Sequence, residues 1–309
     1  MDMVHHKKTW YWNLLTISVT ILMLVQVTAC SSLLRGIGLG STPDYPTAEV
    51  VFQVSLPEPL DEQNQLVLEV LDDITGMYFN ASRYEMVQKQ GSVYFTHVPL
   101  IISSEIKYRY VKVGENTGYE FNSQNSQVRF RILKVTGPEL VQDIVSAWID
   151  RKYEGPLGRI QGQVFDKRTN APIPNLLVCA GGLQTVTSSD GSYYLEGLVP
   201  GVHNLIFYSM DGAYETFQQG ALVSDQATTP AFISLAKRDE VELTFNVKVP
   251  QGYDSSMPLR FVSNLQTLGN AYADLSSGSS GNAANYPSLT KISPTDYQLT
   301  LKLPKGLFL

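Results

Sequence analysis

Few side chains in this sequence are grouped in a way that supports catalysis. Four histidines are scattered along the chain, at positions 5, 6, 97 and 203, so they do not build a conventional zinc site. No H-E-x-x-H, G-x-S-x-G, Walker or dinucleotide-binding motif is present. The adjacent carboxylates Asp61-Glu62 and Asp72-Asp73 fall in loops or at strand ends, where solvated charge is the ordinary role. We therefore predict a protein that is not an enzyme and that holds no metal ion and no cofactor.

The charge balance excludes one large class of partner. The chain has 309 residues, with 23 Lys+Arg against 29 Asp+Glu and a formal net charge of −6. A nucleic-acid-binding protein needs basic stripes that neutralise phosphates, so we predict no nucleic-acid partner. A hydrophobic fraction of 43% is ample for packed cores, and the length allows two or three domains. Two cysteines cannot form a disulfide framework.

The N-terminal segment carries a targeting signal. Lys7 and Lys8 precede an apolar run that extends from Leu14 to Val27, and small residues follow, which is the pattern of a secretory signal. Val27-Thr28-Ala29-Cys30 resembles the bacterial lipobox, and this resemblance implies cleavage before Cys30 and lipid attachment to that residue. We predict a lipoprotein signal peptide over 1–29. The alternative is a retained signal-anchor helix in which Cys30 is incidental.

Lipid attachment at Cys30 would place the mature chain outside the cytoplasm. Each buried methylene of an acyl chain contributes about 0.8 kcal/mol, so several acyl chains anchor a protein on a membrane effectively permanently. Residues 30–45 mix Gly, Ser and Pro, which is typical of a flexible tether. We therefore expect a membrane-anchored lipoprotein at the cell surface, whose first partner is the membrane itself.

The rest of the chain alternates apolar and polar residues with the period of β-strands. Val51–Pro57 and Ile106–Val111 are two such runs, and turn residues separate each run from the next. Short strands at this spacing predict antiparallel sandwiches. We predict an all-β fold of serial antiparallel β-sandwiches of the immunoglobulin or transthyretin type. The sandwiches are expected over 46–136, 158–237 and 240–309.

An internal repeat relates the first and third segments. Val50–Pro57 aligns with Leu243–Pro250, and Tyr84-Glu85-Met86 parallels Tyr286-Pro287-Ser288 further along. Together with Ile106–Tyr110, which looks like the family's I-x-Y-K-Y strand, these landmarks resemble the starch-binding-domain family. The resemblance implies a carbohydrate-binding fold in both segments.

Sugar-binding members of that family usually stack tryptophan rings on the sugar. The tryptophans of this chain stand only at positions 10, 12 and 148, in the signal and between modules. A platform would therefore use other aromatic residues, and we predict Tyr78, Phe79 and Tyr119 as the carbohydrate-binding residues. The alternative is ordinary edge or core packing of these rings, because aromatic side chains bury a large area wherever they lie.

The middle segment has the clearest pattern of turn residues between its strands. The motifs G-x-V-x-D, T…P-I, D-G-x-Y and L-x-P-G follow one another along this segment. They begin or lie at Gly162–Asp166, Thr169–Pro174, Asp190-Gly191 and Pro200-Gly201, in that order. This order resembles the carboxypeptidase regulatory-like family, a transthyretin-like sandwich, and the resemblance implies a module without catalysis.

The aspartates and the cysteine of this module are expected to have structural roles, in turns and in the core. Asp190-Gly191 is expected to close a tight hairpin between Thr185–Ser188 and Tyr193–Leu195. One carboxylate per loop is too few for calcium, so Asp166 is expected to serve the turn. Cys179 lies in an apolar run and is expected to be a buried core thiol.

Two further expectations concern the segment boundaries. Residues 137–157 form a linker in which Pro138–Ile149 has helical spacing, although the family resemblance favours an extended connector. In the repeat alignment, 240–309 lacks the closing strands of the first segment. We therefore expect a truncated third sandwich with an open edge, in a chain that is a fragment or a truncated gene product.

These features predict a non-catalytic cell-surface lipoprotein whose modules bind an α-glucan-like carbohydrate. The first alternative is a structural or protein-interaction stalk that does not bind sugar. The second alternative is the targeting arm of a longer extracellular enzyme.

Overall fold

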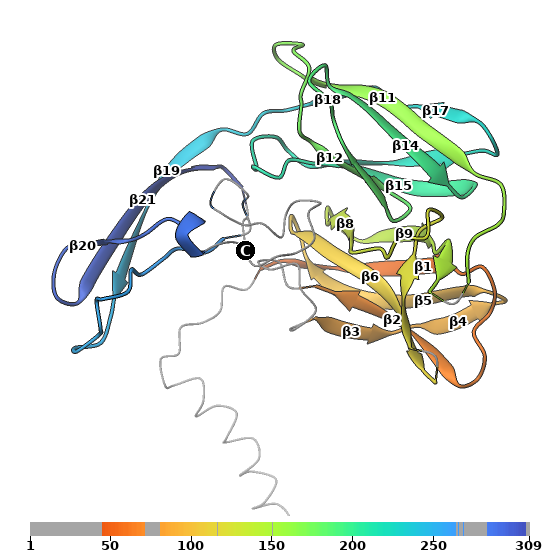
Figure 1. Ribbon diagram of the computed structural model, residues 1–309, viewed down its shortest axis with the longest axis horizontal. Coiled ribbons are helices and arrows are strands. Elements are labelled where there is room, and N and C mark those ends of the chain that lie inside the picture. The colour runs from red at the N-terminus through yellow and green to blue at the C-terminus, as the bar shows by residue number, and fades with distance from the viewer. Residues whose placement is uncertain are drawn as a thin grey trace, which may run out of the picture. The chain divides into compact units, whose positions relative to one another are not determined.

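The computed structural model describes residues 45–71, 81–115, 117–149, 151–263, 265, 268 and 283–306. These residues fold into strands and one 3-10 turn, η4 (Ala283–Asn285), without an α-helix, which confirms the all-β prediction (Figure 1). Residues 46–309 form one compact unit. No helix within the described ranges is long and apolar enough to cross a membrane.

The first module is a sandwich of two sheets. One sheet has the order β4-β5-β1-β9, and the other has the order β10-β7-β6-β2-β3 with β8 paired to β6. The strands are β1 (Thr47–Ser55), β2 (Asn64–Val70), β3 (Ser82–Glu85), β4 (Val87–Gln90), β5 (Val93–Ile101), β6 (Glu105–Gly114), β7 (Gly118–Phe121), β8 (Arg131–Lys134), β9 (Glu139–Ile144) and β10 (Ala147–Trp148). Alternation directs Val50, Phe52 and Val54 of β1 into the core. There Phe52 meets Tyr108 of the opposite sheet edge to face, with ring centroids 5.0 Å apart.

The segment predicted as a linker contains part of this first sandwich. Residues 139–144 form β9, which pairs in parallel with β1 from Val50↔Glu139 to Ser55↔Ile144. The helical alternative for Pro138–Ile149 is therefore wrong. Within β9, Val141 and Asp143 are buried while Leu140 is 55% exposed, which is the alternation of a strand. Pairing with the edge of β1 satisfies its backbone groups, and this tertiary contact overrides the helical spacing.

The middle module is a second sandwich. One sheet has the order β14-β11-β17 with β18 also paired to β11, and the other has the order β13-β12-β15-β16 (Figure 1). The strands are β11 (Gly158–Asp166), β12 (Leu177–Ala180), β13 (Leu183–Val186), β14 (Ser192–Leu198), β15 (Gly201–Tyr208), β16 (Phe217–Val223), β17 (Thr228–Pro230) and β18 (Ile233–Leu235). Ile160, Val164, Leu205 and Phe207 are fully buried between the two sheets.

The turn at Asp190-Gly191 does not close a hairpin. Gly191 has a φ of 76°, as expected for a tight turn, but β13 pairs with β12 and β14 pairs with β11. The turn therefore carries the chain from one sheet to the other, and the hairpin prediction is wrong. The buried Thr187 fixes this crossing, because its hydroxyl donates to the Ile173 carbonyl at 2.8 Å and accepts from the Leu176 amide at 2.9 Å.

The two sandwiches pack directly on each other. An apolar cluster joins residues of both modules, among them Phe130, Ile132, Cys179 and Ile206. The Gln218 side chain accepts from the Lys134 amide at 2.9 Å and donates to the Lys134 carbonyl at 3.0 Å. Cys179 is buried in this cluster, as predicted, and burial raises the pKa of its thiol.

The last described segment contains a single sheet. Its strands are β19 (Glu240–Lys248), β20 (Thr290–Lys291) and β21 (Asp296–Pro304), in the order β19-β21-β20. Its small core comprises Val249, Leu289 and Tyr297, with Leu259 and Phe261 packed against them.

Candidate functional site

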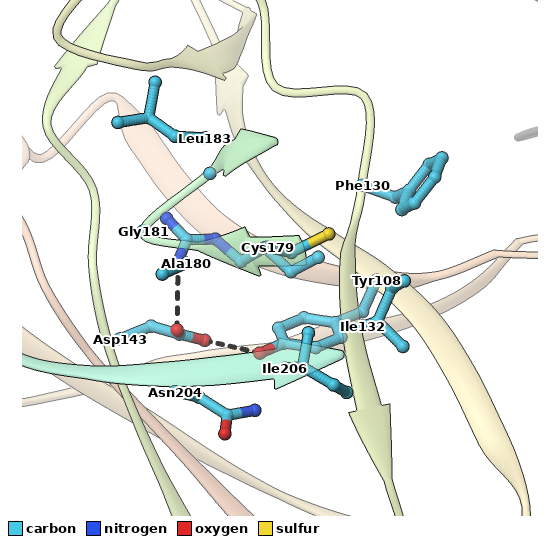
Figure 2. Close-up of a pocket in the computed structure, with 12 residues that line it drawn as sticks. Tyr108, Phe130, Ile132, Asp143, Cys179, Ala180, Gly181, Leu183, Asn204 and Ile206 are labelled. Atoms are coloured by element: carbon cyan, nitrogen blue, oxygen red, sulfur yellow. Dashed lines mark hydrogen bonds and ion pairs between the residues drawn. The ribbon is translucent and has the colours of Figure 1, made fainter. Parts of the chain in front are cut away.

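A buried charge network lies inside the first module. Arg131 donates from Nη2 to Glu120 Oε2 at 2.8 Å and from Nη1 to Asp143 Oδ1 at 2.9 Å. The hydroxyls of Tyr108 and Tyr110 each donate to Asp143 Oδ2 at 2.8 Å. Figure 2 shows the Asp143 carboxylate joined to the Tyr108 hydroxyl beneath the strand that carries Cys179.

The electrostatics of this network stabilise its charged form. Burial raises the pKa of Tyr108 and of Tyr110 well above the ordinary tyrosine value, and the negative charge of Asp143 reinforces this effect. Both hydroxyls therefore stay protonated and donate hydrogen bonds to Asp143. Burial alone lowers the pKa of Arg131, but the charges of Glu120 and Asp143 reverse that effect and raise it. The cavity beside the network has a volume of only about 10 Å³, which holds at most one water molecule. The network is therefore structural rather than a ligand site.

The structure places one of the predicted carbohydrate-binding residues. Tyr119 lies on β7, is half-buried, and has the Arg109 guanidinium 4.1 Å from its ring centroid. That cation covers one face of the ring. Tyr78 and Phe79 lie outside the described residues, as does Cys30, so the platform and the lipid attachment site stay predictions.

A groove with exposed aromatic rings lies on the middle module. It has a volume of about 460 Å³ and is lined by residues of β11, β13 and β14 and by Phe232, which follows β17. Tyr194 is 44% exposed and Phe232 is 69% exposed. Tyr194 stands opposite Gln161 in the register of β14 and β11. Two aromatic side chains and an exposed amide therefore border one concave surface.

Close backbone packing brings Phe232 to the groove. A Cβ at Gly162 would lie 1.7 Å from the Ala231 carbonyl oxygen, so only glycine permits this approach. The Ala231 amide donates to the Gln161 carbonyl at 2.9 Å, and the Tyr193 hydroxyl donates to the Ala231 carbonyl at 2.8 Å. With Ala231 fixed from both sides and buried, Phe232 is directed outward.

The polar lining of the groove suits a neutral, hydroxyl-rich ligand. Asp190 accepts from the Ser192 amide at 3.0 Å, and hydrogen bonds from the Ser192 side chain and backbone lower the pKa of that carboxyl. Asp190 is therefore an ionised acceptor beside the amides of Gln161 and Gln163. Rings that stack on apolar ring faces, together with donors and acceptors for hydroxyl groups, are the components of a carbohydrate site.

The sequence contains one signal for this groove, the adjacent aromatic residues Tyr193 and Tyr194. Tyr193 and Tyr194 are consecutive in a strand, so they point to opposite faces of the sheet. Tyr193 is buried and Tyr194 is exposed. A pair of adjacent aromatic residues in a strand always leaves one ring on the outer face. The position of Phe232 had no such signal, because it depends on the contact between Gly162 and Ala231.

A second groove is less suited to a sugar. It has a volume of about 490 Å³ and includes Trp148, Arg151 and Glu58 in its lining. Trp148 is only 3% exposed, so its ring face is not available for stacking, and Arg151 forms an ion pair with Glu58. Over the described ranges no group of three His, Cys, Asp or Glu residues is placed to hold a metal ion. Asp166 serves its turn, accepting from the amides of Arg168 and Thr169.

Comparison with known proteins identifies no family. No family model matches the chain, and no curated protein matches it. Solved structures show weak similarity to this chain, and three of them serve as examples. A glycoside hydrolase family 15 glucoamylase from Hypocrea jecorina has 13% identity and a TM-score of 0.26, covering 35% of this chain and 19% of the glucoamylase. The Bacillus anthracis TIE protein has 12% identity and a TM-score of 0.23, covering 69% and 38%. The minor pilin GBS52 of Streptococcus agalactiae has 12% identity and a TM-score of 0.24, covering 67% and 99%.

The extent of these matches limits their meaning. The chain spans less than half of the glucoamylase and of the TIE protein. All three TM-scores lie below the level at which two chains share a fold, so none of the three defines the function of this chain.

Proposed function

We propose that this protein is a non-catalytic lipoprotein of the cell surface that binds carbohydrate through the groove of its middle module. The signal segment and Cys30 support export and lipid anchoring. The observation that carries the binding proposal is the pair of exposed rings, Tyr194 and Phe232, on one groove with amide and carboxylate groups. The ligand class that we propose is a neutral polysaccharide, because the rings supply stacking and the polar groups match hydroxyls. The resemblance of the flanking segments to starch-binding domains makes an α-glucan the first ligand to test.

Binding to insoluble starch and to a panel of soluble glucans tests this proposal. The sample is the soluble protein of residues 46–309, which form one compact unit. A polysaccharide that binds this protein removes it from solution, and the protein that remains is measured. We expect Tyr194→Ala and Phe232→Ala each to weaken binding about tenfold, since stacking of a ligand ring on an aromatic side chain contributes about 1–3 kcal/mol in the comparable case of nucleic-acid bases. Leu222→Ala is the matched control, because Leu222 is 64% exposed on β16 outside the groove.

Two outcomes separate the groove from the platform predicted in the first module. Loss of binding in the Tyr194 and Phe232 variants, with Tyr119→Ala unchanged, assigns the site to the middle module. Loss only in Tyr119→Ala or in a Tyr78→Ala/Phe79→Ala variant assigns it to the first module. Failure of the parent protein to bind any member of the panel contradicts the carbohydrate proposal.

A specific observation favours a second function, that of a rigid stalk. The shared apolar cluster and the paired Lys134–Gln218 hydrogen bonds fix the first two modules to each other. A stalk requires such fixed joints, whereas independent binding modules do not. If the joint is rigid, the two modules unfold in one thermal transition, and Gln218→Ala moves that transition to lower temperature. Two separate transitions in the parent protein would contradict the stalk.

A further inference from the structure

The sheet of the last segment, β19-β21-β20, has one apolar face and one polar face. Neither face of its first strand, β19, is buried. Val241, Leu243, Phe245 and Val247 of β19 point to the apolar face, and the residues between them point to the polar face. Every residue of β19 is exposed or half-buried, with Leu243 44% and Val247 37% exposed.

Within the part of the chain that the structure describes, one backbone edge of β19 has no strand beside it. In the sheet order β19-β21-β20, the strand pairs with β21 along its whole length, from Glu240↔Pro304 to Lys248↔Asp296. Within the described residues no other strand pairs with β19. An unpaired edge of this length is a template for another strand, because its outward amides and carbonyls lack backbone partners.

The sequence of β19 is complementary to itself in the antiparallel direction. When two copies pair about Thr244, Glu240 of each copy stands opposite Lys248 of the other. In the same register Val241 stands opposite Val247 and Leu243 opposite Phe245, so apolar side chains face apolar side chains.

The charges of β19 favour an antiparallel pair over a parallel one. A parallel arrangement in register would place glutamate beside glutamate and lysine beside lysine, which is destabilising. In the antiparallel register Glu240 opposes Pro304 on its own sheet, so no carboxylate of β21 competes for that position. Lys248 already faces Asp296 across the sheet, and a second copy would place it between two carboxylates.

We propose that β19 is a docking surface for a second copy of this chain. The two copies join their three-stranded sheets edge to edge through an antiparallel β19 pair centred on Thr244. The contact is isologous, since the same strand serves on both sides, and it closes at two copies. This inference concerns assembly and does not depend on whether the groove of the middle module binds carbohydrate.

Cysteine crosslinking in the full chain tests the register. Thr244→Cys places a thiol on the two-fold axis, where facing Cα atoms of an antiparallel pair lie about 4.5–5.5 Å apart, within disulfide range. Gln298→Cys is the matched control, because Gln298 lies on the same face of the sheet but is paired on both sides, with Asn246 of β19 and with Thr290 of β20. Under mild oxidation we expect a disulfide-linked dimer from Thr244→Cys on a non-reducing gel. Gln298→Cys is expected to give no more dimer than the parent chain.

Charge reversal in the Thr244→Cys background tests the partner strand. Glu240→Lys places lysine opposite lysine, and Lys248→Glu places glutamate opposite glutamate, so each is expected to slow crosslinking about fivefold or more. The double variant Glu240→Lys/Lys248→Glu restores opposite charges and is expected to restore the parent rate. Equal crosslinking of Thr244→Cys and Gln298→Cys overturns the docking surface. Crosslinking of Thr244→Cys that neither single reversal changes overturns the register.

Discussion

Arg131 and Asp143 form a buried ion pair that joins the two sheets of the first sandwich. The guanidinium nitrogen lies 2.9 Å from the carboxylate, Arg131 belongs to β8 on one sheet, and Asp143 belongs to β9 on the other. Their side chains are 5% and 4% exposed. The same carboxylate receives two tyrosine hydroxyls, so one aspartate satisfies three buried donors. This ion pair therefore helps to hold β9 within the first sandwich.

Removal of the Asp143 carboxylate is expected to destabilise the protein strongly. Asp143→Ala leaves Arg131 Nη1 and two tyrosine hydroxyls buried without their acceptor, and breaking a buried ion pair in this way costs about 3–5 kcal/mol. Urea unfolding of residues 46–309 measures the loss. The control Glu196→Ala removes a carboxylate that is 60% exposed and 3.8 Å from Arg159, and is expected to change the unfolding free energy by less than about 1 kcal/mol. Equal effects of the two substitutions would contradict the role of Asp143.

A substitution at Gly162 tests the close approach that positions Phe232. The added methyl group of Gly162→Ala would meet the Ala231 carbonyl oxygen at 1.7 Å, so the backbone has to move. We expect destabilisation of about 1–3 kcal/mol, the usual cost of overpacking. Gly220→Ala is the matched control on strand β16, where the nearest atom to the new methyl lies 3.7 Å away in ordinary contact. Thermal unfolding of both variants should show a loss only for Gly162→Ala.

Period-two alternation was sufficient to predict the all-β class and the main strands. The run Val51–Pro57 overlaps β1, in which every second side chain is buried in the core. The prediction failed for Pro138–Ile149, where Leu140, Val141, Ile144 and Val145 satisfy helical spacing equally well. Only the available edge of β1, which is distant in sequence, decides between the two structures. The Asp190-Gly191 turn shows the same limit, because local turn chemistry does not reveal which sheet each flanking strand joins.

The candidate site was less accessible to sequence reasoning than the fold. Tyr119 was chosen as an aromatic residue in a loop, yet it lies in β7 beneath the Arg109 guanidinium. Tyr194 was overlooked because it lies within a strand, although its neighbour Tyr193 occupies the core and leaves it on the outer face. Phe232 joins it only through the β17–β18 crossing beside Gly162. The groove arises from contacts across the sheet, and one-dimensional patterns do not contain them.

Lipid attachment at Cys30 is tested by labelling in bacterial cells. If the lipobox resemblance is correct, the full chain incorporates an alkyne-tagged fatty acid, and Cys30→Ala abolishes the label. The control Cys179→Ala should retain it, because Cys179 is 5% exposed in the cluster between the modules and does not meet a membrane enzyme. Label that persists in Cys30→Ala would favour the retained signal-anchor helix.

His203 makes stability depend on pH below neutrality. It is 2% exposed on β15, and its Nε2 lies 2.6 Å from the Val199 carbonyl. Burial lowers the pKa of His203 from its ordinary value of 6.5, so the folded protein keeps the ring neutral while the unfolded chain binds a proton. The unfolding free energy should therefore be constant above about pH 7.5 and fall below pH 6.5, by at most about 1.4 kcal/mol per pH unit. In urea unfolding between pH 7.5 and 5.5, His203→Gln should remove this decline, and the exposed His97→Gln should retain it. A decline of equal slope in His203→Gln would assign the proton to another group.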